Sequence, residues 1–135
     1  MSPGSNQPAL RSAATETHEG SVEMRGTSRI RIHDGHLERF KELAQQCVEI
    51  VRTQDSGTLE YRLYLNPNGT ECFVHERYRD SAAGLEHMAN IAVMMEPLSE
   101  VCTITGEVCG DPSLQLREAL EAAGVTIYGP LNSAT

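Results

Sequence analysis

The clearest pattern in the chain is an apolar residue at every third or fourth position between residues 37 and 51. This is the spacing of one stripe of an amphipathic helix, and the positions between are mostly Glu, Gln and Arg. The preceding segment, residues 22–32, ends in alternating apolar and polar residues instead and predicts a β-strand. Asp34-Gly35 offers a start for the helix, and Asp55-Ser56-Gly57 predicts its end.

Two further alternating segments, residues 59–65 and 72–78, flank an Asn-Pro-Asn-Gly run that is typical of a turn. Together they predict a β-hairpin. We expect Leu65 to pair with Thr70 across the turn. One carboxylate, that of Glu76, then falls on the apolar face of the hairpin.

Asp80-Ser81 predicts the start of a second helix, which we expect to run to about Met95 and to end before Pro97. Residues 100–109 predict a fourth strand. A short helix beginning at Asp111-Pro112 and a last strand near residues 125–128 follow. The order β-α-β-β-α-β predicts an α+β, ferredoxin-like subunit with a four-stranded antiparallel sheet and two helices on one face, plus a C-terminal helix-strand extension.

The domain boundaries follow from this order. Residues 1–20 are rich in polar and turn-forming residues and predict a disordered N-terminal tail. Residues 21–110 form the ferredoxin-like domain, and residues 111–135 form the extension. The uncovered face of the sheet would carry Arg62, Tyr64, Phe73 and His75, a mixture that favours a partner surface, most simply a second copy of the chain.

Composition excludes several classes of function. The formal net charge is −8 and Lys41 is the only lysine, which argues against binding to nucleic acid or to an anionic membrane surface. No apolar run is long enough to span a membrane, and no signal peptide is evident. The four cysteines form no CxxC pair, so reduced thiols and a cytoplasmic location are expected. Motifs for ATP, NAD or common hydrolase chemistry are absent, and we expect no metal site and no cofactor.

A set of short motifs in order gives the chain a family resemblance. These are His33-Asp34-Gly35, Gly57-Thr58-Leu59-Glu60-Tyr61, Glu76-Arg77-Tyr78-Arg79-Asp80 and Leu85-Glu86-His87. Over about residues 22–108 the chain resembles the antibiotic biosynthesis monooxygenase domain family. The extension, residues 112–130, is similar to one in the quinol-monooxygenase-like members.

The resemblance implies a homodimeric α+β barrel in which each subunit keeps its own pocket for a small aromatic or apolar molecule. It also implies a cofactor-independent monooxygenase acting on a quinol-like substrate, with Glu76 and His87 as catalytic residues. A second histidine common in the family is missing here, and no Trp is present to distort a haem, so haem degradation is disfavoured. The alternative is a non-catalytic small-molecule-binding or stress-related protein of the same fold.

The chemistry needs a base, a dry pocket and hydrogen-bond donors for a developing oxyanion. His87 fits the base and Glu76 could orient or replace it. Other interpretations remain open: Glu76 could pair with Arg29 or Arg31, and His87 could be structural. The expected substrate-binding residues are Tyr61, Tyr78, Phe40, Met88, Asn90, Ile91 and Met95.

Overall fold

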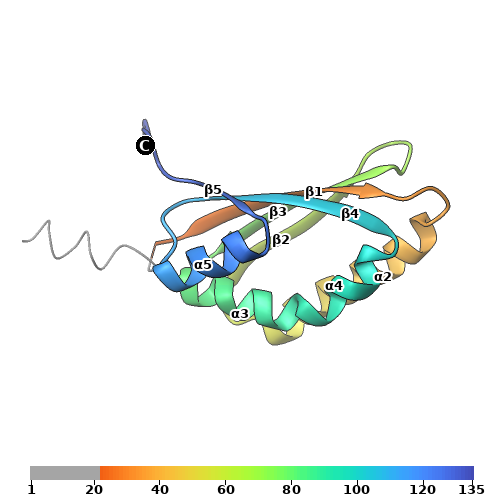
Figure 1. The fold of residues 1–135 in the computed structure, drawn as a ribbon, viewed down its shortest axis with the longest axis horizontal. Coiled ribbons are helices and arrows are strands. Elements are labelled where there is room, and N and C mark those ends of the chain that lie inside the picture. Colours follow the sequence, from red (N-terminus) through yellow and green to blue (C-terminus); the bar gives the residue numbers. More distant parts are fainter. Residues whose placement is uncertain (1–21) are drawn as a thin grey trace, which may run out of the picture.

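The computed structural model describes residues 22–135, so the tail expected over residues 1–20 lies outside the described part of the chain. The strands are β1 (Met24–Ile32), β2 (Thr58–Leu65), β3 (Glu71–Tyr78), β4 (Cys102–Cys109) and β5 (Thr126–Tyr128). The helices are α2 (Leu37–Gln54), α3 (Ser81–Ile91), η1 (Ala92–Met94), α4 (Met95–Ser99) and α5 (Leu114–Ala122). The strands form one sheet, and the helices lie on one face of it (Figure 1).

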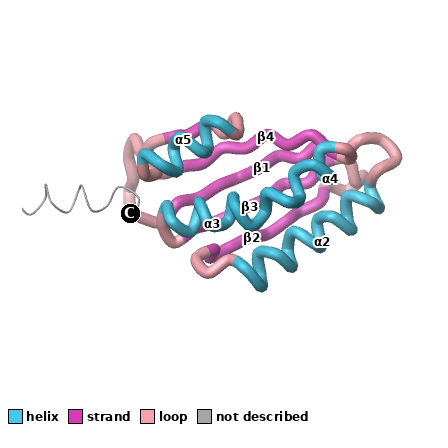
Figure 2. The backbone as a smooth tube through the Cα atoms, turned by 60° about the horizontal axis from the view of Figure 1, so that its bottom comes forward, coloured by secondary structure: helices cyan, strands magenta, loops and turns pink. Residues whose placement is uncertain are grey.

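The sheet has the order β2-β3-β1-β4-β5, with β1 antiparallel to both β3 and β4. This order confirms the α+β, ferredoxin-like prediction. The extension adds β5 parallel to β4, while α5 lies beside α3 on the helical face (Figure 2). The helices therefore cover most of one sheet face and leave the opposite face open.

The hairpin register differs from the expected one by two residues. Leu65 pairs with Cys72 rather than with Thr70, and Tyr61 lies opposite Glu76. The loop is longer because the Oδ1 atom of Asn66 accepts hydrogen bonds from the backbone N–H groups of Thr70 and Glu71, both at 2.9 Å. The side chain of Asn66 thus closes the loop before strand pairing begins, an Asx-type interaction that the turn sequence alone did not reveal.

The prediction that one helix runs to Met95 and stops before Pro97 is also wrong. The α-helix ends at Ile91, a 3₁₀ turn follows, and Pro97 lies inside the first turn of α4. Proline is tolerated there because a first-turn N–H has no acceptor within the helix. The interruption turns Val93 outward, where it is 70% exposed.

Two apolar clusters hold the helices on the sheet. The larger one joins β1, β3, α2 and α4 and includes Phe40, Leu43 and Val74. The smaller one consists of Met24, Leu116 and Leu120, with partly buried side chains around them. Because two of its three members come from α5, the extension has a core of its own against the first strand.

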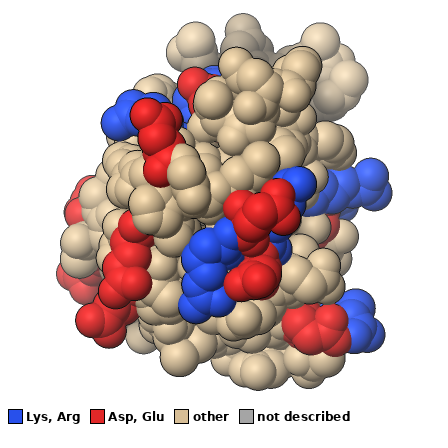
Figure 3. Space-filling model, turned by 90° about the vertical axis from the view of Figure 1, so that its right-hand side faces the viewer, with Lys and Arg blue, Asp and Glu red and all other residues tan. Residues whose placement is uncertain are grey.

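The surface carries mixed charge. At the end of the molecule seen in Figure 3, acidic and basic side chains lie next to each other, and exposed ion pairs such as Arg39–Glu42 at 3.1 Å run along α2. Such an arrangement offers no continuous basic patch on that face. Among the described residues, no helix is long and apolar enough to cross a membrane.

Candidate active site

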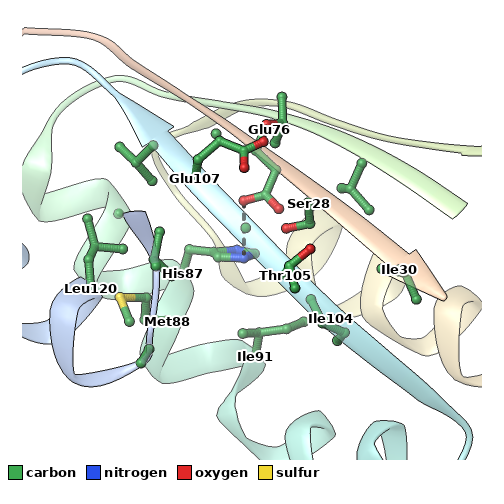
Figure 4. A pocket seen from close by; sticks show the side chains of 18 of the residues that line it. Ser28, Ile30, Glu76, His87, Met88, Ile91, Ile104, Thr105, Glu107 and Leu120 are labelled. Carbon is green, nitrogen blue, oxygen red and sulfur yellow. Dashed lines mark hydrogen bonds and ion pairs between the residues drawn. The ribbon is translucent and has the colours of Figure 1, made fainter. Parts of the chain in front are cut away.

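A cavity of about 610 Å³ lies between the helical face of the sheet and α3. Its floor is made of small residues on β1 and β4, namely Gly26, Ser28 and Gly106. Small side chains leave space above the sheet that longer ones would fill. Figure 4 shows His87 and Glu76 facing each other, with Leu120 and Met88 on one side of them and Ile30 and Ile104 on the other.

His87 is held by a buried carboxylate. Its Nδ1 atom lies 2.8 Å from Oδ2 of Asp55. The side chain of His87 is 10% exposed and that of Asp55 is 1% exposed. Asp55 follows the last residue of α2, whereas His87 lies in the middle of α3. The carboxylate accepts the hydrogen bond from Nδ1, so Nε2 points away from Asp55, toward Glu76.

The carboxylate of Asp55 is fixed by three donors. Asn90 donates to Oδ1 at 2.8 Å and Thr58 donates to Oδ2 at 2.7 Å, in addition to His87. Burial alone would raise the pKa of Asp55, but hydrogen bonds from Asn90, Thr58 and His87 outweigh it and lower the pKa below the ordinary value. Asp55 is therefore a charged, oriented partner for the imidazole.

Glu76 faces the other ring nitrogen. Its Oε1 atom lies 3.9 Å from Nε2 of His87, which is too far for a direct hydrogen bond, and accepts a hydrogen bond from the hydroxyl of Tyr78. The alternative that Glu76 pairs with Arg29 or Arg31 is wrong. Gly26 lies opposite Glu76 on β1, so by strand alternation both arginines belong to the open face, where Arg29 pairs with Glu71 at 3.7 Å.

Two tyrosines enclose the imidazole. The ring centroids of Tyr61 and Tyr78 lie 5.5 Å and 5.2 Å from that of His87. Burial, with the nearby Glu76, raises the pKa of Tyr78 far above its ordinary value, and burial together with Cys47 raises that of Tyr61. Both phenols therefore remain protonated and can act as hydrogen-bond donors.

The structure brings nearly all of the predicted site residues together. The cavity lining includes Phe40, Tyr61, Glu76, Tyr78, His87, Met88, Ile91 and Met95. Asn90 is the exception: it is not in the lining and instead donates to Asp55. His75 lies on the open face beside Phe73, with ring centroids 5.0 Å apart.

Sequence reasoning missed Asp55. The motif Asp55-Ser56-Gly57 predicts only the end of a helix, and this aspartate does stand at the C-cap of α2. The available signal was weak: aspartate is unfavourable at a helix C-terminus, where the carbonyl groups carry partial negative charge. The hydrogen bond with His87 explains why a carboxylate stands at this locally unfavourable position.

The arrangement can accept a proton from a molecule bound in the cavity. An oriented imidazole faces the cavity beside a carboxylate, and apolar side chains and phenols surround both. Among residues 22–135, no group of three His, Cys, Asp or Glu side chains is placed to hold a metal ion. These features define a candidate site for general base chemistry on a small apolar molecule.

Comparisons with known proteins agree with the fold. The family model of the antibiotic biosynthesis monooxygenases matches residues 24–93, and the chain belongs to this family. A comparison with curated proteins finds no match.

Solved structures share the architecture. MupZ from Pseudomonas fluorescens is 24% identical, covers 84% of this chain and 94% of its own, and has a TM-score of 0.72. SnoaB from Streptomyces nogalater, described as a cofactor-independent oxygenase and solved as a point mutant, is 15% identical with a TM-score of 0.57, over 64% of this chain and 89% of its own. Rv0793 from Mycobacterium tuberculosis is 18% identical with a TM-score of 0.56, over 84% of this chain and 99% of its own. At these identities the likeness establishes the fold.

Proposed function

We propose that the protein is a cofactor-independent monooxygenase that acts on a small aromatic, quinol-like substrate. The observation that carries the proposal is the Asp55–His87 pair, whose Nδ1–Oδ2 distance is 2.8 Å and whose imidazole lines a largely apolar cavity. Membership of the antibiotic biosynthesis monooxygenase family and the likeness to SnoaB, a cofactor-independent oxygenase, support the reaction type.

The proposed reaction begins with proton abstraction. Nε2 of His87 takes a proton from a substrate hydroxyl, and Asp55 stabilises the imidazolium that forms. The resulting anion is electron-rich enough to react with dioxygen. One oxygen atom enters the ring and the other leaves as water, so that a quinol and O₂ yield a hydroxyquinone and H₂O.

Glu76 and the phenols have supporting roles. Glu76, held by the hydroxyl of Tyr78, accepts a second donor of the substrate and can receive the proton from His87. The hydroxyl of Tyr61 is a candidate donor for the developing oxyanion. The buried, apolar surroundings exclude water and strengthen each of these interactions.

The test is oxygen consumption with reduced menadione. We expect the wild-type protein to consume one O₂ for each hydroxyquinone formed. The rate of oxygen consumption should exceed the rate of uncatalysed autoxidation of the quinol. His87→Gln should lose at least about a hundredfold in kcat because the base is removed. His75→Gln, on the open face, is the matched control and should keep the wild-type rate.

Equal rates for wild type and His87→Gln would contradict the proposal. Tight binding of menadione without oxygen uptake would instead support the non-catalytic alternative, in which the same fold only binds a small molecule.

We also propose that the molecule is a homodimer through the open sheet face. Tyr64 is 52% exposed there, and the guanidinium of Arg29 lies 4.9 Å from the ring centroid of Phe73. Aromatic and arginine side chains of this kind are enriched at protein interfaces. A second copy would cover this face and close the two sheets into a barrel.

A further inference from the structure

The turn between α2 and β2, residues 55–57, packs against one face of α3. Its first residue is Asp55, whose Oδ2 atom lies 2.8 Å from Nδ1 of His87. Its last residue is Gly57, where a Cβ atom would lie 2.5 Å from Cβ of Ala83. The turn is therefore in contact with α3 at both of its ends.

Between these two contacts, Ser56 is bound to α3 by a single carboxylate. Oε1 of Glu86 accepts hydrogen bonds from the backbone N–H of Ser56 at 2.8 Å and from its hydroxyl at 2.9 Å. Both donors of Ser56 thus converge on one charged oxygen. Hydrogen bonds to a charged acceptor are stronger than those between neutral groups, so this contact fixes the turn with more force than an ordinary surface contact.

The contacts run in opposite order along the two segments. Positions 83, 86 and 87, within about one turn of α3, meet positions 57, 56 and 55 of the turn. Residues three or four apart lie on the same side of a helix, so α3 presents these side chains together. The Ser56–Glu86 pair therefore lies next to the Asp55–His87 pair. Because Ser56 and Asp55 are covalently joined, a displacement of the first also displaces the second.

The backbone of Asp55 receives little support from its own helix. Asp55 is the C-cap of α2, and its φ and ψ angles of −80° and 135° are extended, not helical. The residue after it, Ser56, is exposed, so apolar packing does not hold it in place. The direction of the Asp55 side chain therefore depends on a polar contact at Ser56, and Glu86 provides that contact.

We propose that Glu86 is a positioning residue for the Asp55–His87 pair. By binding Ser56, it keeps Oδ2 of Asp55 in line with Nδ1 of His87, and so maintains the orientation and the tautomer of the imidazole. In this role the carboxylate of Glu86 acts as a hydrogen-bond acceptor, and its charge is not required. The proposal rests on the site of the proposed function, but its first test measures the imidazole and not the reaction.

Nitrogen-15 NMR of the labelled histidines in the full-length protein tests the state of the imidazole, at a pH at which it is neutral. The variant His87→Gln assigns the signals of His87. We expect the wild-type protein to show one tautomer, with the proton on Nδ1. Glu86→Ala should show a mixture of both tautomers. Glu86→Gln should keep the wild-type spectrum, because its amide oxygen still accepts from Ser56.

Two results of this experiment would overturn the proposal. The first is a wild-type spectrum for Glu86→Ala, which would show that the contact with Ser56 does not affect the imidazole. The second is an equal change in Glu86→Gln and Glu86→Ala, which would show that the charge acts on His87 and that the hydrogen bonds do not.

Oxygen uptake with reduced menadione measures the effect on catalysis. Glu86→Ala should lower kcat about tenfold, because a misaligned base stabilises the transition state less well. KM should stay within about twofold, since Glu86 does not touch the quinol. Glu118→Ala removes an exposed glutamate of α5 and is the matched control, with wild-type values expected. A raised KM with an unchanged kcat would contradict a positioning role.

A second variant covers the case in which Glu86→Ala does not fold. Ser56→Ala removes the hydroxyl and keeps the backbone N–H, at an exposed position. It should show a smaller share of the second tautomer and lose about threefold in kcat, because one of the two hydrogen bonds remains. In the Glu86→Ala background it should cause no further loss. A wild-type spectrum and rate for Ser56→Ala, or additive losses in the double variant, would count against the proposal.

The positioning role and the proposed function fail separately. A change of tautomer in Glu86→Ala, without oxygen uptake by the wild-type protein, would keep the positioning role and remove the oxygenase. Oxygen uptake that depends on His87 but not on Glu86, with an unchanged imidazole spectrum, would do the reverse.

Discussion

Asp55 and His87 are 32 residues apart in the chain, yet Oδ2 of the first lies 2.8 Å from Nδ1 of the second. The pair links the C-terminal end of α2 to the middle of α3. Because Asp55 is nearly fully buried and fixed by Asn90 and Thr58, it sets both the orientation and the tautomer of the imidazole.

The first prediction concerns Asp55 as a positioning residue. Asp55→Asn should lower kcat for the quinol by about a hundredfold with little change in KM, because an amide can hold the imidazole in the wrong tautomer. Asn90→Ala, which removes one donor to Asp55, should have a smaller effect. Steady-state oxygen uptake measures both, and a wild-type kcat for Asp55→Asn would show that the pair is only structural.

The second prediction is a pH dependence of stability. The pKa of Asp55 is lowered in the folded protein relative to its ordinary value of 3.8, so its charged form stabilises the fold at and above that pH. This contribution should disappear as the pH falls from about 4 through the folded-state pKa. The variant Asp55→Asn has no carboxylate at this position and therefore lacks this stabilising contribution at every pH.

Urea unfolding of both proteins at several pH values tests this expectation. The stability difference between wild type and Asp55→Asn should be largest near neutrality and shrink below about pH 4. Asp34→Asn, at an exposed position, should differ little from wild type throughout. A difference independent of pH would argue that the carboxylate charge contributes nothing.

The third prediction concerns Gly57, where β2 meets α3. A Cβ atom there would lie 2.5 Å from Cβ of Ala83, closer than two such atoms can approach. Gly57→Ala should therefore destabilise the protein by about 1–3 kcal/mol, measured by urea unfolding. Gly129→Ala, with nothing within 4 Å, is the control. Adding Ala83→Gly should recover part of the loss, and a lack of coupling between the two sites would refute this account.

The fourth prediction separates stability from function at Gly26. A Cβ atom there meets Cβ and Oε1 of Glu76 at 3.8 Å, which is ordinary contact. Gly26→Ala should keep or raise stability by about 0.5–1 kcal/mol, because glycine is unfavourable inside a strand. It should also raise KM for the quinol, because the methyl group enters the cavity next to Glu76. Unchanged kinetics would place the substrate elsewhere.

The fifth prediction concerns assembly. The wild-type protein should sediment as a dimer, and Phe73→Glu should shift it toward the monomer by placing a charge in the centre of the open face. Val93→Glu adds the same charge at an apolar position that is 70% exposed on the helical side, and should leave the dimer intact. A wild-type monomer at micromolar concentration would remove the proposed interface.

Hydrophobic periodicity was enough to predict the ferredoxin-like order of strands and helices. It also placed Glu76 on the apolar face and His87 on the second helix, since strand alternation and helical spacing decide such facing locally. Alternation and helical spacing can be seen in a single sequence because each strand and helix must bury one face. The resemblance to the antibiotic biosynthesis monooxygenase family came from the same segments.

The tertiary structure decided what depends on contacts between distant segments. Asn66 moved the hairpin register through its side-chain hydrogen bonds, and Asp55 became the partner of His87 only when α2 and α3 packed together. Likewise, Leu116 of the extension approaches Gly84 only because α5 packs against α3. The number of residues between two such side chains does not reveal that they are in contact. Their distance depends on how the elements that carry them pack together.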